Sequence, residues 1–103
     1  MDRFGLARSF AGGIREKYPD IVKVVLFGSV ARKEDKEGSD IDLLVVSRGD
    51  RFDARRRIMS DVVDTLLRTG VYVSVKTVSE DEYGKLKGTF FFSDIDKAGV
   101  VLG

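Results

Sequence analysis

The chain of 103 residues contains no cysteine and no histidine. Without cysteine it can form neither a disulfide nor a zinc-thiolate site, and it has no thiol nucleophile. Without histidine it has no imidazole to act as a general base or as a metal ligand. Any metal ion must therefore be held by oxygen atoms, and oxygen ligands favour Mg²⁺ or Mn²⁺.

Excess charge of one sign and long apolar runs are also absent. Eighteen Lys and Arg residues face 17 Asp and Glu residues, so the net charge of +1 does not indicate a strongly basic surface for nucleic acid. Apolar runs such as 24–27 are far too short to cross a membrane, and the first residues lack the apolar core of a signal peptide. We therefore expect a cytoplasmic protein with neither a membrane nor a nucleic acid as its partner.

Apolar spacing and turn residues predict one α+β domain over residues 1–103. Strands are predicted where β-branched residues are concentrated, and helices where apolar residues recur at a spacing of three to four. The order of the segments favours a small mixed sheet of three or four strands with helices packed against it. The predicted strands are 21–27, 40–47 and 71–78, and the predicted helices lie before Pro19, at 52–68 and after Ser79.

Two segments also have a predicted inner face. In the long helix the residues expected to pack on the core are Met59, Val62, Val63, Leu66 and Leu67. In the third strand alternate valines are expected to face the core, and the residues on the other face are Tyr72, Ser74 and Lys76.

Gly28-Ser29, ten intervening residues and Asp40-Ile41-Asp42 form the most informative pattern in the sequence. Phosphates bind well where a strand turns through glycine into a helix start, because backbone N–H groups point outward there. Gly28 would let a phosphate approach the backbone closely, and Ser29 would supply a hydroxyl donor or a helix cap. The turn is therefore a candidate nucleotide-binding element.

The two aspartates stand two residues apart on the second predicted strand, so both carboxylates are expected on one face. Their side chains can converge on one or two Mg²⁺ ions, while Ile41, Leu43 and Val45 face the core. Because one triphosphate must reach both Gly28-Ser29 and Asp40, the end of the first strand must lie beside the start of the second. The two strands are therefore predicted to run antiparallel.

Phe27-Gly28-Ser29-Val30-Ala31-Arg32 followed by Ser39-Asp40-Ile41-Asp42-Leu43-Leu44-Val45 resembles the signature of the DNA polymerase β-like nucleotidyltransferase superfamily. Within it the chain is most similar to the minimal nucleotidyltransferases, the antitoxins paired with HEPN-domain toxins. The resemblance covers nearly the whole chain, and the ending 95–102 also resembles that of the family. It implies a nucleotidyltransferase fold.

The resemblance also implies an activity and its participants. The chain would transfer a nucleoside monophosphate, AMP from ATP, to an acceptor hydroxyl, and the acceptor would be a tyrosine of a HEPN toxin. Asp40 and Asp42 would be the catalytic residues and would hold Mg²⁺ in a site for one or two ions. The residues expected to bind the nucleotide are Gly28, Ser29, Arg32 and Ser39.

Two positions depart from the family pattern. Lys33 stands where a glycine often follows the Ala-Arg pair, and Ser74 stands where a third carboxylate is common on the third strand. That carboxylate usually helps to hold the metal that activates the attacking hydroxyl. The sequence therefore leaves open an alternative, a nucleotide-binding or partner-binding antitoxin with weak or no catalysis.

Two further clusters have more than one interpretation. Arg55-Arg56-Arg57 is a solvated helix start or a contact for a partner or for nucleic acid. Phe90-Phe91-Phe92 covers the core, but three adjacent rings cannot all point inward. At least one ring is therefore a candidate for a contact with a partner or with a second copy of the chain in a homo-oligomer.

Overall fold

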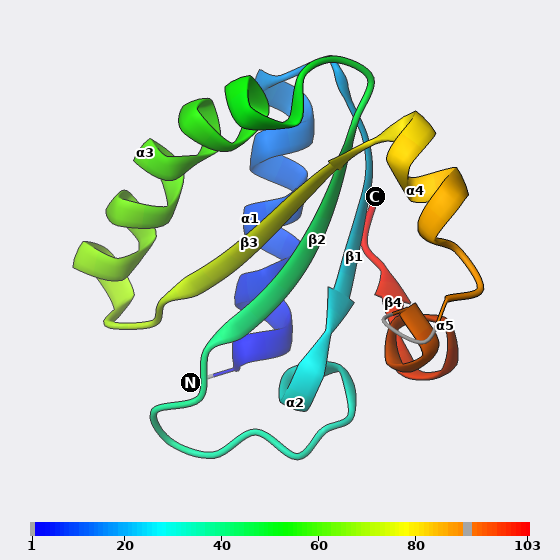
Figure 1. Cartoon of the computed structure of the whole chain (residues 1–103). Coiled ribbons are helices and arrows are strands. Elements are labelled where there is room, and N and C mark those ends of the chain that lie inside the picture. The colour runs from blue at the N-terminus through cyan, green and yellow to red at the C-terminus, as the bar shows by residue number, and fades with distance from the viewer. Residues whose placement is uncertain (1, 90–91) are drawn as a thin grey trace.

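The computed structural model describes residues 2–89 and 92–103, which form a four-stranded mixed sheet with helices on both faces (Figure 1). The predicted α+β class and the order of the segments are confirmed. No helix in this described part of the chain is long and apolar enough to span a membrane. The elements are α1 (Arg3–Lys17), β1 (Ile21–Phe27), α2 (Gly28–Ala31), β2 (Ile41–Ser47), α3 (Arg51–Thr69), β3 (Val73–Ser79), α4 (Glu80–Leu86), α5 (Ser93–Ala98) and β4 (Val100–Val101).

The strands lie in the order β3-β2-β1-β4. β1 pairs with β2 in the antiparallel direction, as predicted, and it also pairs antiparallel with β4. β3 runs parallel to β2. The end of β1 and the starts of β2 and β3 therefore meet at one end of the sheet, where Asp42 pairs with Phe27 on one side and with Ser74 on the other.

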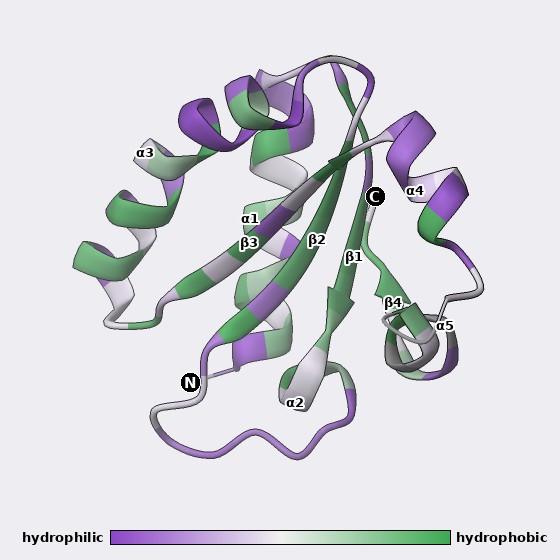
Figure 2. Ribbon diagram, viewed as in Figure 1, coloured by the Kyte–Doolittle hydropathy of each residue, from purple (hydrophilic) through white to green (hydrophobic). Residues whose placement is uncertain are grey.

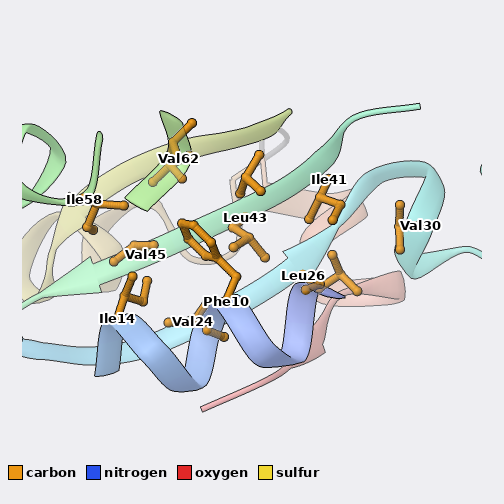
Figure 3. Close-up of a cluster of buried hydrophobic side chains, with 14 of the residues drawn as sticks. Phe10, Ile14, Val24, Leu26, Val30, Ile41, Leu43, Val45, Ile58 and Val62 are labelled. Carbon is orange, nitrogen blue, oxygen red and sulfur yellow. The ribbon is translucent and has the colours of Figure 1, made fainter. Parts of the chain in front are cut away.

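The larger core lies between the sheet and the helices α1 and α3 (Figure 3). α1 contributes one buried stripe because its apolar residues recur at helical spacing, and Asp2 accepts a hydrogen bond from the Gly5 N–H to cap it. From β2 the predicted inward residues are all buried: Ile41, Leu43 and Val45. The other labelled core residues in Figure 3 are Phe10, Ile14, Val24, Leu26, Val30, Ile58 and Val62.

A second core covers the opposite face of the sheet, which the sequence pattern did not predict. It contains Leu44 and Val46 from β2, and it also includes Val25, Val78, Phe92 and Ile95. After Asp42 both faces of β2 are thus apolar, because α4 and α5 cover the face that carries the aspartate. Phe92 is fully buried and meets Tyr83 edge to face, with 5.7 Å between ring centres. Phe90 and Phe91 lie outside the described residues.

The predicted inner face of the long helix was partly wrong. The residues of α3 that are buried are Ala54, Ile58, Val62 and Thr65. Of the residues predicted to pack inward, Val63 and Leu66 are exposed, and Leu67 is 81% exposed. The core-facing stripe of α3 is narrow because the helix packs mainly over the edge strand β3, so one flank has no neighbour in the sheet.

Helix ends are set by side-chain caps that the sequence indicates. Asp50 accepts a hydrogen bond from the Phe52 N–H at 2.8 Å, and Gly70 ends α3 with a φ of 76°. Ser79 and Glu82 form a capping box at the start of α4, where the sequence predicted a helix. Strand bounds differ slightly, since β2 begins at Ile41 rather than at Asp40, and β3 spans Val73–Ser79 rather than 71–78.

Candidate functional site

The turn from β1 into α2 brings the backbone of Gly28 against the Asp42 carboxylate. Gly28 has a φ of 75°, in the left-handed region that favours glycine. A β-carbon built on Gly28 would lie 3.1 Å from Asp42 Cγ and 3.3 Å from Asp42 Cβ. The absence of a side chain at position 28 therefore lets the Asp42 carboxylate lie directly against the backbone of the turn.

Asp42 lies near the start of β2, and its side chain is half-buried. Burial is the main cause that raises the pKa of this carboxyl, and the negative charge of Asp40 raises it further. The positive charges of Lys76 and Arg32 act in the opposite direction. The ionised Asp42 is thus held in a place that favours a nearby cation, as the sequence pattern predicted for an aspartate on an apolar strand.

Asp40 is exposed and stands one residue before β2, in the loop that follows α2. Its negative charge raises the pKa of the Asp42 carboxyl, so the two predicted carboxylates interact through their charges. The loop is tied at Ser39, whose hydroxyl accepts a hydrogen bond from the Lys36 N–H at 2.8 Å. Ser39, predicted to contact nucleotide, therefore also shapes the loop that carries Asp40.

The remaining predicted nucleotide contacts lie on α2. Ser29 is half-exposed, and among the described residues none forms a hydrogen bond with its hydroxyl, so this group is open to a ligand. Arg32 ends α2, is exposed, and donates a hydrogen bond to Glu34 at 3.1 Å. The positive charge of Arg32 also lowers the pKa of the Asp42 carboxyl, so the two side chains interact through their charges.

Ser74 stands directly beside Asp42 in the parallel pairing of β2 and β3. Residues that pair across two strands lie on the same face of the sheet. Ser74, the position expected for a third carboxylate, therefore lies next to Asp42. Among the side chains that the structure describes there is no group of three acidic, histidine or cysteine residues that could hold a metal. The acids of α4 do not reach, because Ser79 pairs with Ser47, five residues or roughly 16 Å along β2 from Asp42.

The donor set fits Mg²⁺ in part. Asp40 and Asp42 offer carboxylate oxygens, the ligands that Mg²⁺ prefers, and the Gly28 turn lies directly against the Asp42 carboxylate. Mg²⁺ commonly keeps several waters and binds through one or two carboxylates together with substrate phosphates. The pair is thus suited to an ion that arrives with a triphosphate rather than to one enclosed by protein ligands alone.

One contact at the site was not foreseen from the sequence. The Arg3 guanidinium donates a hydrogen bond from Nε to the Ser39 carbonyl at 2.9 Å and so joins the start of α1 to the loop before Asp40. Arg3 and Ser39 are 36 residues apart, and no local pattern pairs them. The only signal in the sequence was the cap residue at the start of α1, which places Arg3 in the first turn of that helix.

Comparison with known proteins identifies relatives that match most of the chain. The profile of the nucleotidyltransferase domain family matches residues 7–96. A protein of Methanocaldococcus jannaschii that is named as a protein adenylyltransferase is 33% identical over 96 residues, which are 92% of this chain and 92% of that protein.

Solved structures share the fold. A nucleotidyltransferase of Sulfolobus solfataricus has a TM-score of 0.59 and 24% identity, with 94% of this chain and 76% of that chain covered. A toxin-antitoxin complex with AMP-PNP has a TM-score of 0.61 and 20% identity, with 93% of this chain and 72% of that chain covered. The complex of a tri-AMPylated HEPN toxin with the MNT antitoxin from Shewanella oneidensis has a TM-score of 0.53 and 19% identity, with 100% of this chain and 72% of that chain covered. At these identities the matches show the fold.

Proposed function

Because this chain belongs to the nucleotidyltransferase domain family, we propose that it transfers AMP from ATP to a hydroxyl group of a protein. The observation that carries the proposal is the contact of the Gly28 backbone with the Asp42 carboxylate, beside Asp40. A turn suited to phosphate and a pair of acids suited to a cation meet there at one end of the sheet. An ATP donor also favours the cytoplasm as the place of the reaction.

Each residue has a role in this proposal. Gly28 lets the triphosphate lie against the backbone, and Ser29 donates its hydroxyl hydrogen to a phosphate oxygen. Asp40 and Asp42 would hold Mg²⁺, which when bound neutralises phosphate charge and favours ionisation of the acceptor hydroxyl. Arg32 attracts the phosphates through its positive charge.

The transfer itself exchanges one phosphorus–oxygen bond for another. The acceptor oxygen forms a bond to the α-phosphorus, and the bond from that phosphorus to the oxygen bridging the β-phosphate breaks. Pyrophosphate leaves, and the acceptor proton passes to water. The chain positions both reactants in line, which is the main contribution of a protein to this chemistry.

Relatives favour a protein as the acceptor. The Methanocaldococcus relative is named as a protein adenylyltransferase, and in the Shewanella complex the HEPN toxin carries the AMP groups. We therefore propose a HEPN-type protein as the partner, with a tyrosine as the modified residue. The AMP-PNP in another toxin-antitoxin structure favours ATP as the donor.

Labelled ATP tests the proposal directly. The chain, Mg²⁺ and a HEPN-domain protein from the same genome are incubated with ATP labelled at the α-phosphate and, in parallel, at the γ-phosphate. We expect label on the HEPN protein from the α-position only, and none with the double variant Asp40→Asn/Asp42→Asn. Label from the γ-position would instead identify phosphoryl transfer and would contradict the proposal.

A second function, binding without transfer, is favoured by one observation. Ser74 lies beside Asp42 where a third carboxylate is common, and no other described acid completes the pair. The chain would then neutralise its partner by covering it. A single-turnover experiment with the chain in excess separates the two functions, because a binding module forms the complex but leaves the partner unlabelled.

A further inference from the structure

One flank of α3 carries large apolar side chains in solvent. Val63, Leu66 and Leu67 lie toward the C-terminal end of this helix, and Tyr72 follows in the next segment. Their exposed fractions run from 37% for Tyr72 to 81% for Leu67. Figure 2 shows this apolar end of α3 in green and the polar N-terminal end in purple. Large apolar side chains that gather in solvent are typical of an interaction site.

This flank is the one that points away from α1. The groove between the two helices is lined on the α3 side by Asp61, Asp64, Thr65 and Arg68. Each residue of a helix is rotated by about 100° from the one before it. Val63 and Leu66 therefore lie on one side of the buried Val62, and the residues that line the groove lie on the other. Val63 and Leu66 thus lie beyond β3, the edge strand of the sheet, where no other described element covers them.

The N-terminal end of the same flank is cationic. An open hollow of about 320 Å³ is lined by Arg51, Phe52, Arg55, Lys76 and Thr77. Arg51 is paired with Glu82 at 2.8 Å, but in the described part of the chain neither Arg55 nor Lys76 forms an ion pair. Phe52 beside them is 66% exposed. The flank thus joins an apolar end to two cations that form no ion pair among the described residues.

The flank also borders the acid pair through β3. The Tyr72 carbonyl accepts a hydrogen bond from the Ile41 N–H at 3.0 Å, Ser74 pairs with Asp42, and Lys76 pairs with Leu44. A molecule held along the outer edge of β3 would therefore lie one strand away from Asp42. We call the two ends together the docking face: Phe52, Arg55, Val63, Leu66, Leu67 and Lys76.

We propose that the docking face binds the protein acceptor of the transfer reaction, an inference that rests on the proposed function. The acceptor would contribute an apolar patch bordered by carboxylates. The acids of the partner would pair with Arg55 and Lys76, and its apolar side chains would cover Val63, Leu66 and Leu67.

Charge disfavours a second copy of the chain as the occupant. The face contains no carboxylate, and the nearby Asp53 is already paired with Arg56 and Arg57, so two copies would bury cations without partners.

The apolar end also disfavours nucleic acid. Leucine and valine neither pair with phosphate nor provide the aromatic surface on which bases stack. A protein with apolar and acidic residues on one surface complements both ends of the face. Such a contact would hold the acceptor along β3, beside the acid pair.

Photo-crosslinking in cells of the source organism tests which molecule lies on the face. The full chain is made with p-benzoylphenylalanine in place of Leu67, and a control carries it in place of Arg8, an exposed residue of α1. We expect position 67, and not position 8, to form an adduct with one protein that mass spectrometry identifies as rich in surface acids. An adduct with another copy of the chain, a nuclease-sensitive adduct or no adduct at position 67 would overturn the proposal.

Titration calorimetry with the identified protein then measures the contribution of each end. Leu67→Glu and Arg55→Glu are each expected to weaken its binding at least tenfold, whereas Arg8→Glu, which has the charge change of Arg55→Glu but lies on α1, leaves the affinity unchanged. Both substituted positions are exposed, and unchanged melting temperatures confirm that the variants fold. Equal affinity for the parent and both face variants would overturn the proposal.

The affinity for Mg²⁺-ATP separates this inference from the proposed function. Leu67→Glu and Arg55→Glu should retain it, since neither position lies at Gly28 or Asp42. If the partner binds the face but never receives AMP from the parent chain, the transfer fails and the docking face stands. If the parent transfers AMP and both face variants show the same KM for the partner, the docking face fails alone.

Discussion

The backbone of Gly28 lies so close to the Asp42 carboxylate that a methyl group at position 28 would collide with it. Glycine is also favoured there by its φ of 75°. We therefore expect Gly28→Ala to lower the affinity for Mg²⁺-ATP at least tenfold, as measured by calorimetry. The strained backbone should cost about 1–2 kcal/mol of stability.

Gly38 provides a matched control for this substitution. It has a φ of 89°, but a β-carbon there would meet nothing within 4 Å. Gly38→Ala should therefore lose a similar amount of stability and retain its affinity for nucleotide. Equal losses of nucleotide affinity in the two variants would mean that backbone strain, and not the contact with Asp42, explains the effect.

Asp42→Asn should abolish Mg²⁺-dependent binding of ATP and stabilise the metal-free protein. The pKa of Asp42 is raised by burial and by Asp40, so its negative charge opposes folding at neutral pH. Without metal we expect the melting temperature to rise by roughly 2–4 °C, a fraction of 1 kcal/mol. Asp35→Asn, in the exposed loop, controls for net charge and should change neither property.

Ser74→Asp should strengthen the response to Mg²⁺. The new carboxylate would stand beside Asp42 in the register of β2 and β3, and three acids hold metal better than two. Like-charge repulsion should lower the melting temperature without metal, and added Mg²⁺ should raise it more steeply than in the parent. Ser74→Asn, of the same size without the charge, should behave like the parent. An Mg²⁺ response in Ser74→Asp equal to that of Ser74→Asn would contradict the placement of this residue.

Asp20 and Arg57 should make stability depend on pH below neutrality. Arg57 donates to both carboxylate oxygens, at 2.5 and 3.1 Å, and this hydrogen bonding is the main cause that lowers the pKa of Asp20. The unfolded chain thus binds the proton more tightly than the folded chain does. The stabilisation is full above the unfolded value, about 3.9, and is lost as the pH falls through the lower folded value.

Asp20→Asn should therefore cost about 1 kcal/mol at pH 7, a modest amount because both side chains are about one-third exposed. The difference from the parent should disappear in urea titrations as the pH falls below about 4. Asp64→Asn breaks a more exposed pair with Arg68 and should change stability by less than about 0.5 kcal/mol. A cost for Asp20→Asn that did not vary with pH would point to lost packing instead of lost charge.

Local patterns predicted most of the secondary structure because they depend on neighbouring residues. β1 has the predicted bounds, and a helix follows Ser79 as expected. The inner face of α3 was wrong in part, because apolar residues at helical spacing show that a stripe exists but not which side is covered. Only the position of the helix over the edge strand leaves Leu67 in solvent.

The second core shows the same limit. Leu44 and Val46 follow Asp42 at alternate positions, so a single face changes from polar to buried along one strand. The unbroken apolar run Leu43-Leu44-Val45-Val46 is typical of a strand buried on both faces. It does not show what covers the second face, because α4 and α5 come from a distant part of the chain. The hydrogen bond from Arg3 to Ser39, across 36 residues, was hidden for the same reason.

The sequence by itself determined the chemistry available to this protein. Its lack of cysteine and histidine restricts a metal to oxygen ligands, and the Gly-Ser turn with the Asp-x-Asp strand determines which residues can meet phosphate and cation. The tertiary structure decided which groups meet and which stay exposed. Strand pairing sets Phe27 and Ser74 on either side of Asp42, and helix packing leaves one flank of α3 uncovered. Those relations depend on contacts between segments far apart in the chain, which no local pattern contains.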